Sequence, residues 1–246
     1  MRMTRYTQAR AAGQPCSVGP VSRRLSMEQN RLQRRLAEGD PLWPPQLALA
    51  SSIALHLALS QKVTFGPRWL VPAIEALLLA ALVVVAPARA AEHVQATRRL
   101  ALTVIGVVSL ANVVSLILLI HYLVSGGHTG GRQLIESGGL LWVTNVLLFS
   151  VWYWEMDRGG PVHRHLDPDA PVDFQFPQME NPGLAPKGWR PGYADYLYTS
   201  LTNATAFSPT DVMPLTQTAK LVMGIQSISA LMTIGLVIAR AVNILG

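Results

Sequence analysis

Cysteine is almost absent from this sequence. Cys16 is the only cysteine in 246 residues, so the chain can form neither an internal disulfide framework nor a cysteine metal cluster. The start of the chain also lacks an apolar run, because its first 35 residues carry eight arginines among small and polar residues. We therefore expect no cleavable signal peptide.

Charge is scarce as well. Asp, Glu, Lys and Arg make up 14% of the residues and hydrophobic types 50%, and the mean hydropathy is +0.29. This composition excludes an ordinary soluble domain and predicts a polytopic membrane protein. The net charge of +6 is concentrated in the arginine-rich start, where Tyr6 is the one aromatic residue. We expect that segment to lie near anionic lipid and not to bind nucleic acid.

Long apolar runs define the organisation. We expect spans at 46–61, 69–86, 100–124, 134–155 and 215–244, since a helix needs roughly 20 apolar residues to cross a bilayer. The predicted fold class is all-α, a polytopic membrane helix bundle of about five spanning helices plus one re-entrant helix. The expected parts are a disordered basic tail (1–41), a four-helix membrane region (42–156), a Pro-rich extramembrane linker (157–191) and a C-terminal module (192–246).

A few polar side chains fall inside these spans. Glu75 lies about 9 Å from the start of its helix, where a carboxyl group is costly unless it is protonated or paired. Asn112 is expected to hydrogen-bond a neighbouring helix. Such residues should converge on a wet axis in a pore or proton path, and should pair off between helices in a scaffold. The set consists of His56, Glu75, Asn112, Asn145 and Gln226.

The linker 157–191 contains seven of the seventeen prolines, so we expect no regular helix in it. His163, His165 and Asp167 alternate within it, a pattern that could hold a divalent metal on an extended backbone, but no fourth ligand is evident. We expect no metal and no other cofactor. The aromatic residues of this region are expected to pack back at the headgroup level instead; they are Phe174, Phe176, Trp189, Tyr193, Tyr196 and Tyr198.

The C-terminal module begins with a helix too short to span a bilayer. Residues 193–203 carry neither Pro nor Gly and predict about three turns. The backbone must then break at Ser208-Pro209, because proline lacks a donor and restricts the residue before it. Asp211 is expected to cap the next helix, with Pro214 in its first turn. A short helix, a turn and a long helix predict a re-entrant loop.

This order of parts resembles the pore module of the potassium-channel superfamily, in which a pore helix and a selectivity filter precede an inner helix. The resemblance covers about 50 residues and rests on short motifs. The chain as a whole is similar to a group of uncharacterised bacterial multi-pass membrane proteins, which implies no activity. The matching positions in the module are Ser200, Thr202, Thr205, Asp211, Pro214, Lys220 and Gly235.

The filter itself departs from the family. The family's Thr-Val-Gly-Tyr-Gly is replaced here by Ala206, Phe207, Ser208, Pro209 and Thr210. Glycines let successive carbonyl groups point at one axis, so their loss argues against potassium selectivity.

Basic residues near the spans indicate the orientation. Eight arginines fall on one side of five spans and four basic residues on the other. The positive-inside rule then places the N-terminus and the loop 157–211 in the cytoplasm. Potassium channels enter their pore loop from outside, so this result conflicts with the resemblance. The eight are Arg31, Arg34, Arg35, Arg89, Arg98, Arg99, Arg158 and Arg164; the four are Lys62, Arg68, Arg132 and Arg240.

Two functions are compatible with these features. The first is a pore that passes monovalent ions, lined by hydroxyl and amide groups of Thr202, Asn203, Thr205 and Ser208 in a homo-oligomer, a tetramer by analogy with the channels. The second is a non-conducting scaffold or partner-binding protein in which the turn only joins two helices. Glu155, Asp157 and His163 could do acid-base work, but no nucleophile-base set is readable, so we expect no enzyme. The expected location is the bacterial inner membrane.

Overall fold

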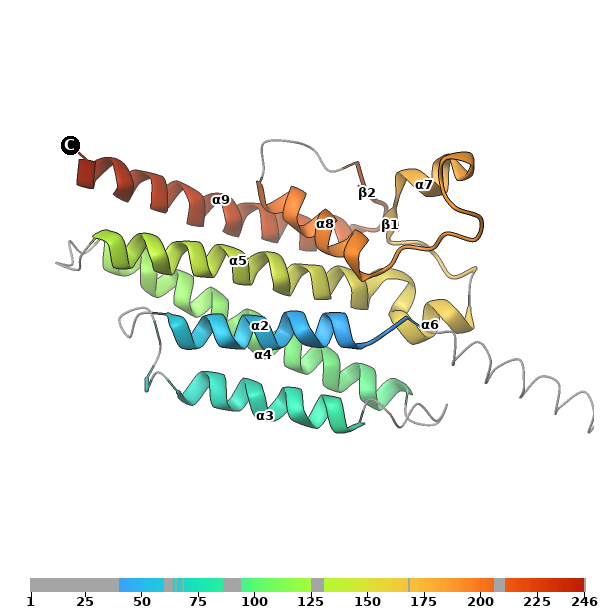
Figure 1. Ribbon diagram of the computed structural model, residues 1–246, viewed down its shortest axis with the longest axis horizontal. Helices are drawn as coiled ribbons and strands as arrows, with labels where there is room; N and C mark the ends of the chain where they lie inside the picture. The colour runs from blue at the N-terminus through green and yellow to red at the C-terminus, as the bar shows by residue number, and fades with distance from the viewer. Residues whose placement is uncertain are drawn as a thin grey trace, which may run out of the picture. The chain divides into compact units, whose positions relative to one another are not determined.

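In the computed structural model, the bundle consists of helices that follow the apolar runs of the sequence (Figure 1). The structure describes residues 40–59, 64, 66–67, 69–85, 94–124, 131–167, 169–205 and 211–245. These residues all belong to one compact unit, 39–246. The expected disordered tail lies outside the described residues, apart from its last two positions.

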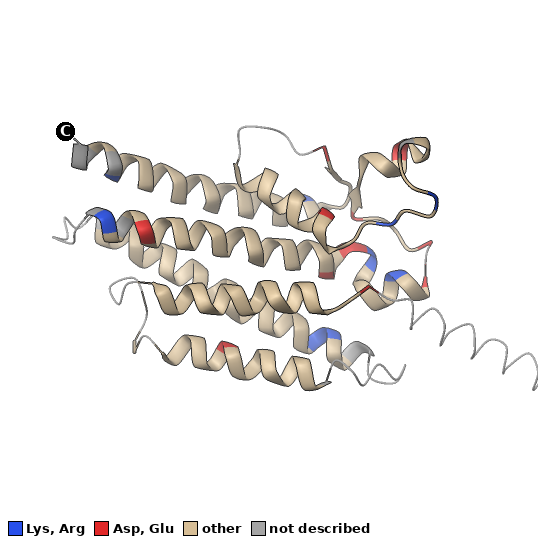
Figure 2. Ribbon diagram, in the orientation of Figure 1, with Lys and Arg blue, Asp and Glu red and all other residues tan. Residues whose placement is uncertain are grey.

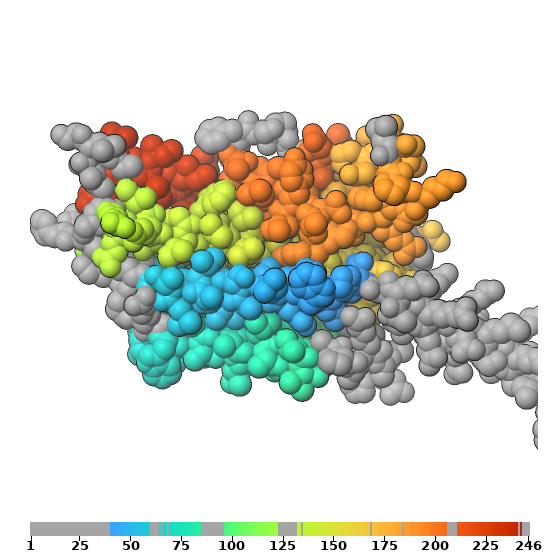
Figure 3. All heavy atoms as spheres, in the orientation of Figure 1, coloured from blue at the N-terminus to red at the C-terminus, as the bar shows by residue number. Residues whose placement is uncertain are grey.

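Four long or medium helices come first. They are α2 (Trp43–Ala58), α3 (Leu70–Val85), α4 (Val94–Val124) and α5 (Gly131–Met156). Prolines sit in the first turn of α2, where the missing N–H costs no hydrogen bond. α2 packs against both α3 and α5, and Figure 3 shows it running between them. Leu49, Leu82, Ile105 and Leu148 form the core of this part of the bundle.

α5 ends at a sharp turn. Arg158, Gly159 and Gly160 have positive φ angles of 52°, 77° and 99°, conformations that glycine adopts at little cost. A short helix, α6 (Pro161–Leu166), follows, and then α7 (Pro177–Glu180) and a 3-10 turn at Pro182–Leu184. The expectation of no regular helix in 157–191 is therefore wrong, because Pro161 and Pro177 each start a helix, the position that proline tolerates.

The last two helices pack on α5. α8 (Tyr193–Thr205) contacts both α5 and α9 (Gln217–Leu245). Gly138 of α5 lies so close to α9 that a Cβ there would stand 2.3 Å from Val237 Cγ2, so a larger residue would force that side chain or the helix to shift. Because α9 is open on its other side, its apolar side chains are exposed, among them Leu221, Ile228, Leu231 and Val242.

A two-residue ribbon fixes the start of α9. Phe174–Gln175 pairs antiparallel with Met213–Pro214, and Leu215 N donates to Asp173 O at 2.8 Å. The backbone is thus extended where Asp211 was expected to begin a helix. Thr216 provides the cap, since its Oγ1 accepts the N–H of Ala219 at 3.2 Å and donates to Asp173 at 2.7 Å. The predicted cap at Asp211 is wrong because the pairing with Phe174–Gln175 is a long-range contact.

Three of the described helices contain stretches long and apolar enough to cross a membrane. These stretches are Ala96–Tyr122, Ile135–Gly159 and Gln217–Arg240, and Leu70–Val84 is a shorter apolar helix. The all-α prediction is thus confirmed and the sequence is compatible with a membrane protein. α2 and α3 have 16 residues each, just below the roughly 17 residues that a spanning helix needs.

Candidate functional site

The polar side chains inside the bundle gather where α5, α8 and α9 meet. Gln226 of α9 is fully buried. Its Nε2 donates to the Ser200 carbonyl at 2.9 Å and lies 2.7 Å from Ser200 Oγ, and its Oε1 accepts from Tyr153 OH. Ser200 Oγ in turn donates to Val146 O at 2.7 Å. One glutamine therefore joins three helices.

Asn203 extends this network along α8. Its Nδ2 lies 2.8 Å from Gln226 Oε1 and 3.0 Å from Met223 O, and its Oδ1 accepts from Ser227 Oγ at 3.0 Å. Both ends of the amide are thus used within the bundle. Hydrogen bonds among buried polar groups of this kind hold membrane helices together.

Two of the hydroxyl groups expected to line a pore, those of Thr202 and Thr205, bond to their own helix. Thr202 Oγ1 donates to Tyr198 O at 2.9 Å, and Thr205 Oγ1 donates to Thr202 O at 2.8 Å. Asp211 is exposed. The filter-like residues 206–210 (Ala206, Phe207, Ser208, Pro209 and Thr210) lie outside the described residues.

The other intramembrane polar residues also have inward positions. His56 Nδ1 lies 3.1 Å from both carboxylate oxygens of Glu75, which gives that buried acid the partner it needs. Asn145 Nδ2 donates to Ser229 Oγ at 2.6 Å, which links α5 to α9. Asn112 is buried, but its Oδ1 has no hydrogen-bond partner among the described residues, so that atom makes no helix-to-helix bond.

A second group of charged residues lies at the α6 end of α5. Figure 2 shows charges gathered at helix ends and in the segment after α5, with the middles of the helices largely uncharged. Arg164 is buried, and its Nε donates to Asp40 Oδ2 at 2.9 Å. Its guanidinium lies 5.3 Å from the ring centres of Trp154 and Tyr196. From the sequence alone, Arg164 counts only among the basic residues that flank the spans, and its burial is not predicted.

Asp157 is the acid at the centre of this group. It is fully buried; its Oδ2 accepts from Tyr196 OH at 2.6 Å, and its Oδ1 accepts the backbone N–H groups of Asp173 and Phe174 at 3.0 and 3.3 Å. Burial raises the pKa of Tyr196 far above its usual range, against the opposing charge of Arg164, so the phenol keeps its proton and donates. Asp157 is therefore a structural acid that holds the linker on the bundle.

The aromatic residues of the linker pack back on the bundle, as expected. Phe174 lies 5.0 Å from Tyr153, and Phe176 lies 5.4 Å from Tyr196 and 6.0 Å from Trp189, measured between ring centres. Tyr198 is the exception, because it is 58% exposed.

The alternating histidines do not form a metal centre with Asp167. They lie on α6, where His163 Nδ1 and His165 Nδ1 are 3.0 and 2.8 Å from the carbonyls of Arg158 and Pro161. Residues two apart on a helix point in different directions. Among the described residues, no group of three His, Cys, Asp or Glu side chains is placed to hold a metal ion.

Two cavities border buried ionisable residues. One, of about 180 Å³, lies at the α6 end of α5 and is lined by Glu155, Arg98 and apolar residues. The other, of about 380 Å³, is bordered by His56 and by apolar residues of α3 and α4. His56 Nε2 is buried and has no partner among the described residues.

Comparison with protein-family models, with curated proteins and with solved structures gives no match.

Proposed function

We propose that this chain is a multi-pass membrane protein in which α8 and α9 form part of a non-conducting scaffold in a homo-oligomer. The observation that carries the proposal is the bonding of Gln226, whose amide joins α5, α8 and α9. In a scaffold, intramembrane polar groups pair between helices. His56 with Glu75, Asn145 with Ser229 and Gln226 with Ser200 follow this pattern.

The course of α8 supports a re-entrant loop. Its first residue, Tyr193, bonds Ser150 near the α6 end of α5, and Ala204 accepts from Trp142 more than two turns farther along α5. Met213 then lies back beside Gln175. The chain therefore enters the bundle and returns to the end from which it came. A helix of 13 residues reaches only about 20 Å, less than a hydrocarbon core.

This course also favours a second candidate, a homo-oligomeric pore that passes monovalent ions without potassium selectivity. Pore-loop channels hold their filter at the end of such a short helix. The lining would come from 206–210 and from backbone carbonyls, because the side-chain donors of Thr202, Asn203 and Thr205 are already engaged. In either case, a second copy of the chain would cover part of the exposed apolar face of α9 in the oligomer.

A flux measurement separates the two candidates. The purified full-length protein in liposomes should pass no more K⁺ or Na⁺ than protein-free liposomes do. A pore would instead pass both ions with little preference, and Phe207→Ala would raise the flux by removing bulk. That pattern would establish conduction in place of the scaffold. A strongly potassium-selective current would contradict both candidates.

For the membrane arrangement we propose five spans, with α2 and α3 as the two short ones, in the bacterial inner membrane with a cytoplasmic N-terminus. The orientation depends on Arg98 and the arginines after α5 lying on the same side of the membrane. The fold supports this grouping, since Arg98 and the turn after α5 border the same cavity. Arg132 lies at the opposite end of α5.

Labelling of single cysteines tests this orientation. In a Cys16→Ser background, we expect Arg132→Cys to react with a membrane-impermeant thiol reagent on intact cells and Lys187→Cys to be protected. Both positions are exposed in the fold, so protection would report the membrane and not burial. Labelling of position 187 and protection of position 132 would show the channel-like orientation and contradict the charge argument.

A further inference from the structure

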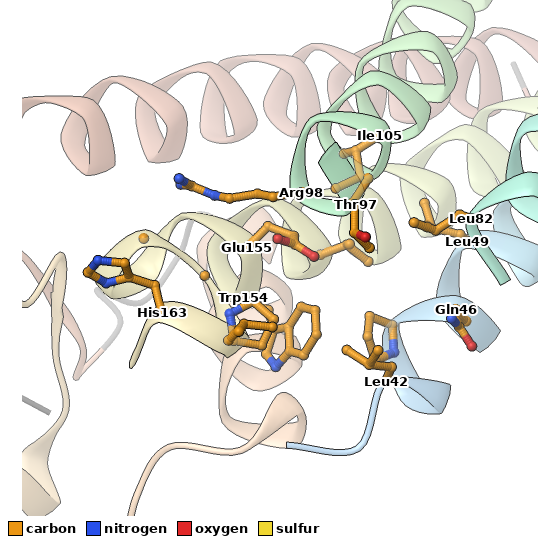
Figure 4. Close-up of a pocket in the computed structure, with 17 residues that line it drawn as sticks. Leu42, Gln46, Leu49, Leu82, Thr97, Arg98, Ile105, Trp154, Glu155 and His163 are labelled. Atoms are coloured by element: carbon orange, nitrogen blue, oxygen red, sulfur yellow. The ribbon is translucent and has the colours of Figure 1, made fainter. Parts of the chain in front are cut away.

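The cavity of about 180 Å³ lies between the starts of α2 and α4 and the end of α5 (Figure 4). Its volume exceeds the roughly 30 Å³ that one water molecule occupies. It is smaller than the roughly 300 Å³ or more of pockets that enclose a whole drug-sized ligand. The cavity therefore suits part of a larger, partly exposed molecule.

Polar and apolar residues are separated along its depth. Arg98 and Glu155 lie near the ends of the candidate spans Ala96–Tyr122 and Ile135–Gly159. Ile105 and Val151 line the same cavity one to two turns farther into those helices. The polar rim thus falls at headgroup depth and the apolar part toward the hydrocarbon, which is the polarity of a phospholipid.

Glu155 is a largely buried acid at this rim. The residue is 7% exposed, and Figure 4 shows its carboxyl group pointing toward the side of the cavity where Thr97, Leu49 and Leu82 lie. Within the described residues its side chain accepts no hydrogen bond, whereas the nearby acids Asp40 and Asp157 each accept at least one. A buried carboxyl group in that position favours a ligand that donates N–H groups.

Arg98 supplies the opposite charge. It is exposed and has no ion pair among the described residues. A Cβ on Gly160 would stand 3.3 Å from Glu155 Oε2 and 3.5 Å from Arg98 Nε, so the two groups lie close together around this glycine. Both Arg164 and Arg98 act on Glu155 electrostatically, and Arg164 is also paired with Asp40 and Asp157.

We propose that this cavity binds a phospholipid with a primary-amine headgroup, such as phosphatidylethanolamine. The ammonium donates to Glu155, Arg98 binds the phosphate, and part of an acyl chain fills the apolar interior. The headgroup carries one positive and one negative charge, and the rim of the cavity carries the opposite charge for each, on Glu155 and on Arg98. The site is independent of whether the C-terminal module conducts ions.

Native mass spectrometry of the purified full-length protein tests this site with lipids of matched acyl chains. Phosphatidylethanolamine should be retained about tenfold better than phosphatidylcholine, since the trimethylated amine keeps its charge but has no N–H to donate. Glu155→Gln should reduce retention of phosphatidylethanolamine to the level of phosphatidylcholine. Arg98→Gln should weaken both lipids to a similar extent. Glu136→Gln, at an exposed acid near the other end of α5, is the control and should change neither.

Equal retention of the two lipids by the unmodified protein would overturn the proposal, and this comparison needs no variant that might misfold. Absence of bound lipid would overturn it as well. A preference for phosphatidylglycerol that Arg98→Gln removes and Glu155→Gln leaves intact would show a phosphate site without amine recognition, and would likewise contradict it.

Discussion

Replacing Asp157 with alanine should lower the melting temperature of the detergent-solubilised protein by about 10 °C. Asp157 is fully buried and accepts hydrogen bonds from Tyr196 OH and from two backbone N–H groups. It also lies 3.9 Å from the Arg164 guanidinium. Its removal leaves buried donors unpaired and Arg164 with one acid fewer, which costs about 3 kcal/mol or more.

Two further variants make this prediction specific. Asp157→Asn keeps an acceptor oxygen and the size of the side chain, so its effect should be intermediate. Asp169→Ala removes an exposed acid from the same linker and should change the free energy of unfolding by no more than about 0.5 kcal/mol. An equal shift for Asp157→Ala and Asp169→Ala would show that the linker is not held through Asp157.

The long helices could be predicted from apolar runs, and the short helix α8 from a stretch without Pro or Gly. The expected spans 100–124 and 134–155 correspond to α4 and α5, whose bounds in the structure are Val94–Val124 and Gly131–Met156. The short helix expected at 193–203 is α8, which ends at Thr205. Each of these depends on local composition, which a sequence displays directly.

The contacts between elements could not be predicted. The ribbon of Phe174–Gln175 with Met213–Pro214 joins residues about 40 positions apart, and it moves the start of α9 from Asp211 to Gln217. The burial of Arg164 between Trp154 and Tyr196 likewise depends on the turn at Gly159 and Gly160. Neither pairing has a local signal, because both depend on how distant segments meet in space.

The hydrogen bonds of the polar residues inside the bundle could be predicted only in part. The cost of such residues in hydrocarbon predicted that Glu75 is either protonated or paired, but not that it lies beside His56, 19 residues earlier on another helix. The same reasoning predicted a hydrogen bond from Asn112 to a neighbouring helix, but its Oδ1 has no partner among the described residues, whereas Asn145 bonds Ser229 of α9. The position of a polar residue within an apolar run thus indicates that it is costly to leave unpaired. Only the packing of the helices shows which residue is its partner.

The pair of His56 and Glu75 should show a strongly non-additive response to mutation. Both side chains are at most 3% exposed, and Nδ1 of the histidine is 3.1 Å from the carboxylate. His56→Leu leaves Glu75 buried without its partner and should destabilise the protein by about 3 kcal/mol. The double variant His56→Leu, Glu75→Leu removes both polar groups and should return the stability to within about 1 kcal/mol of the unmodified protein, because a buried polar pair often contributes no more than apolar packing does.

Thermal unfolding of the single and double variants in one detergent gives the coupling between the two residues. Arg132→Leu with Glu136→Leu is the matched control, since that pair is exposed and should show coupling below about 0.5 kcal/mol. A double variant as unstable as the sum of the single variants would show that each residue acts through its own neighbours. A His56→Leu variant as stable as the unmodified protein would show that Glu75 needs no partner at this depth, and would contradict the expected coupling.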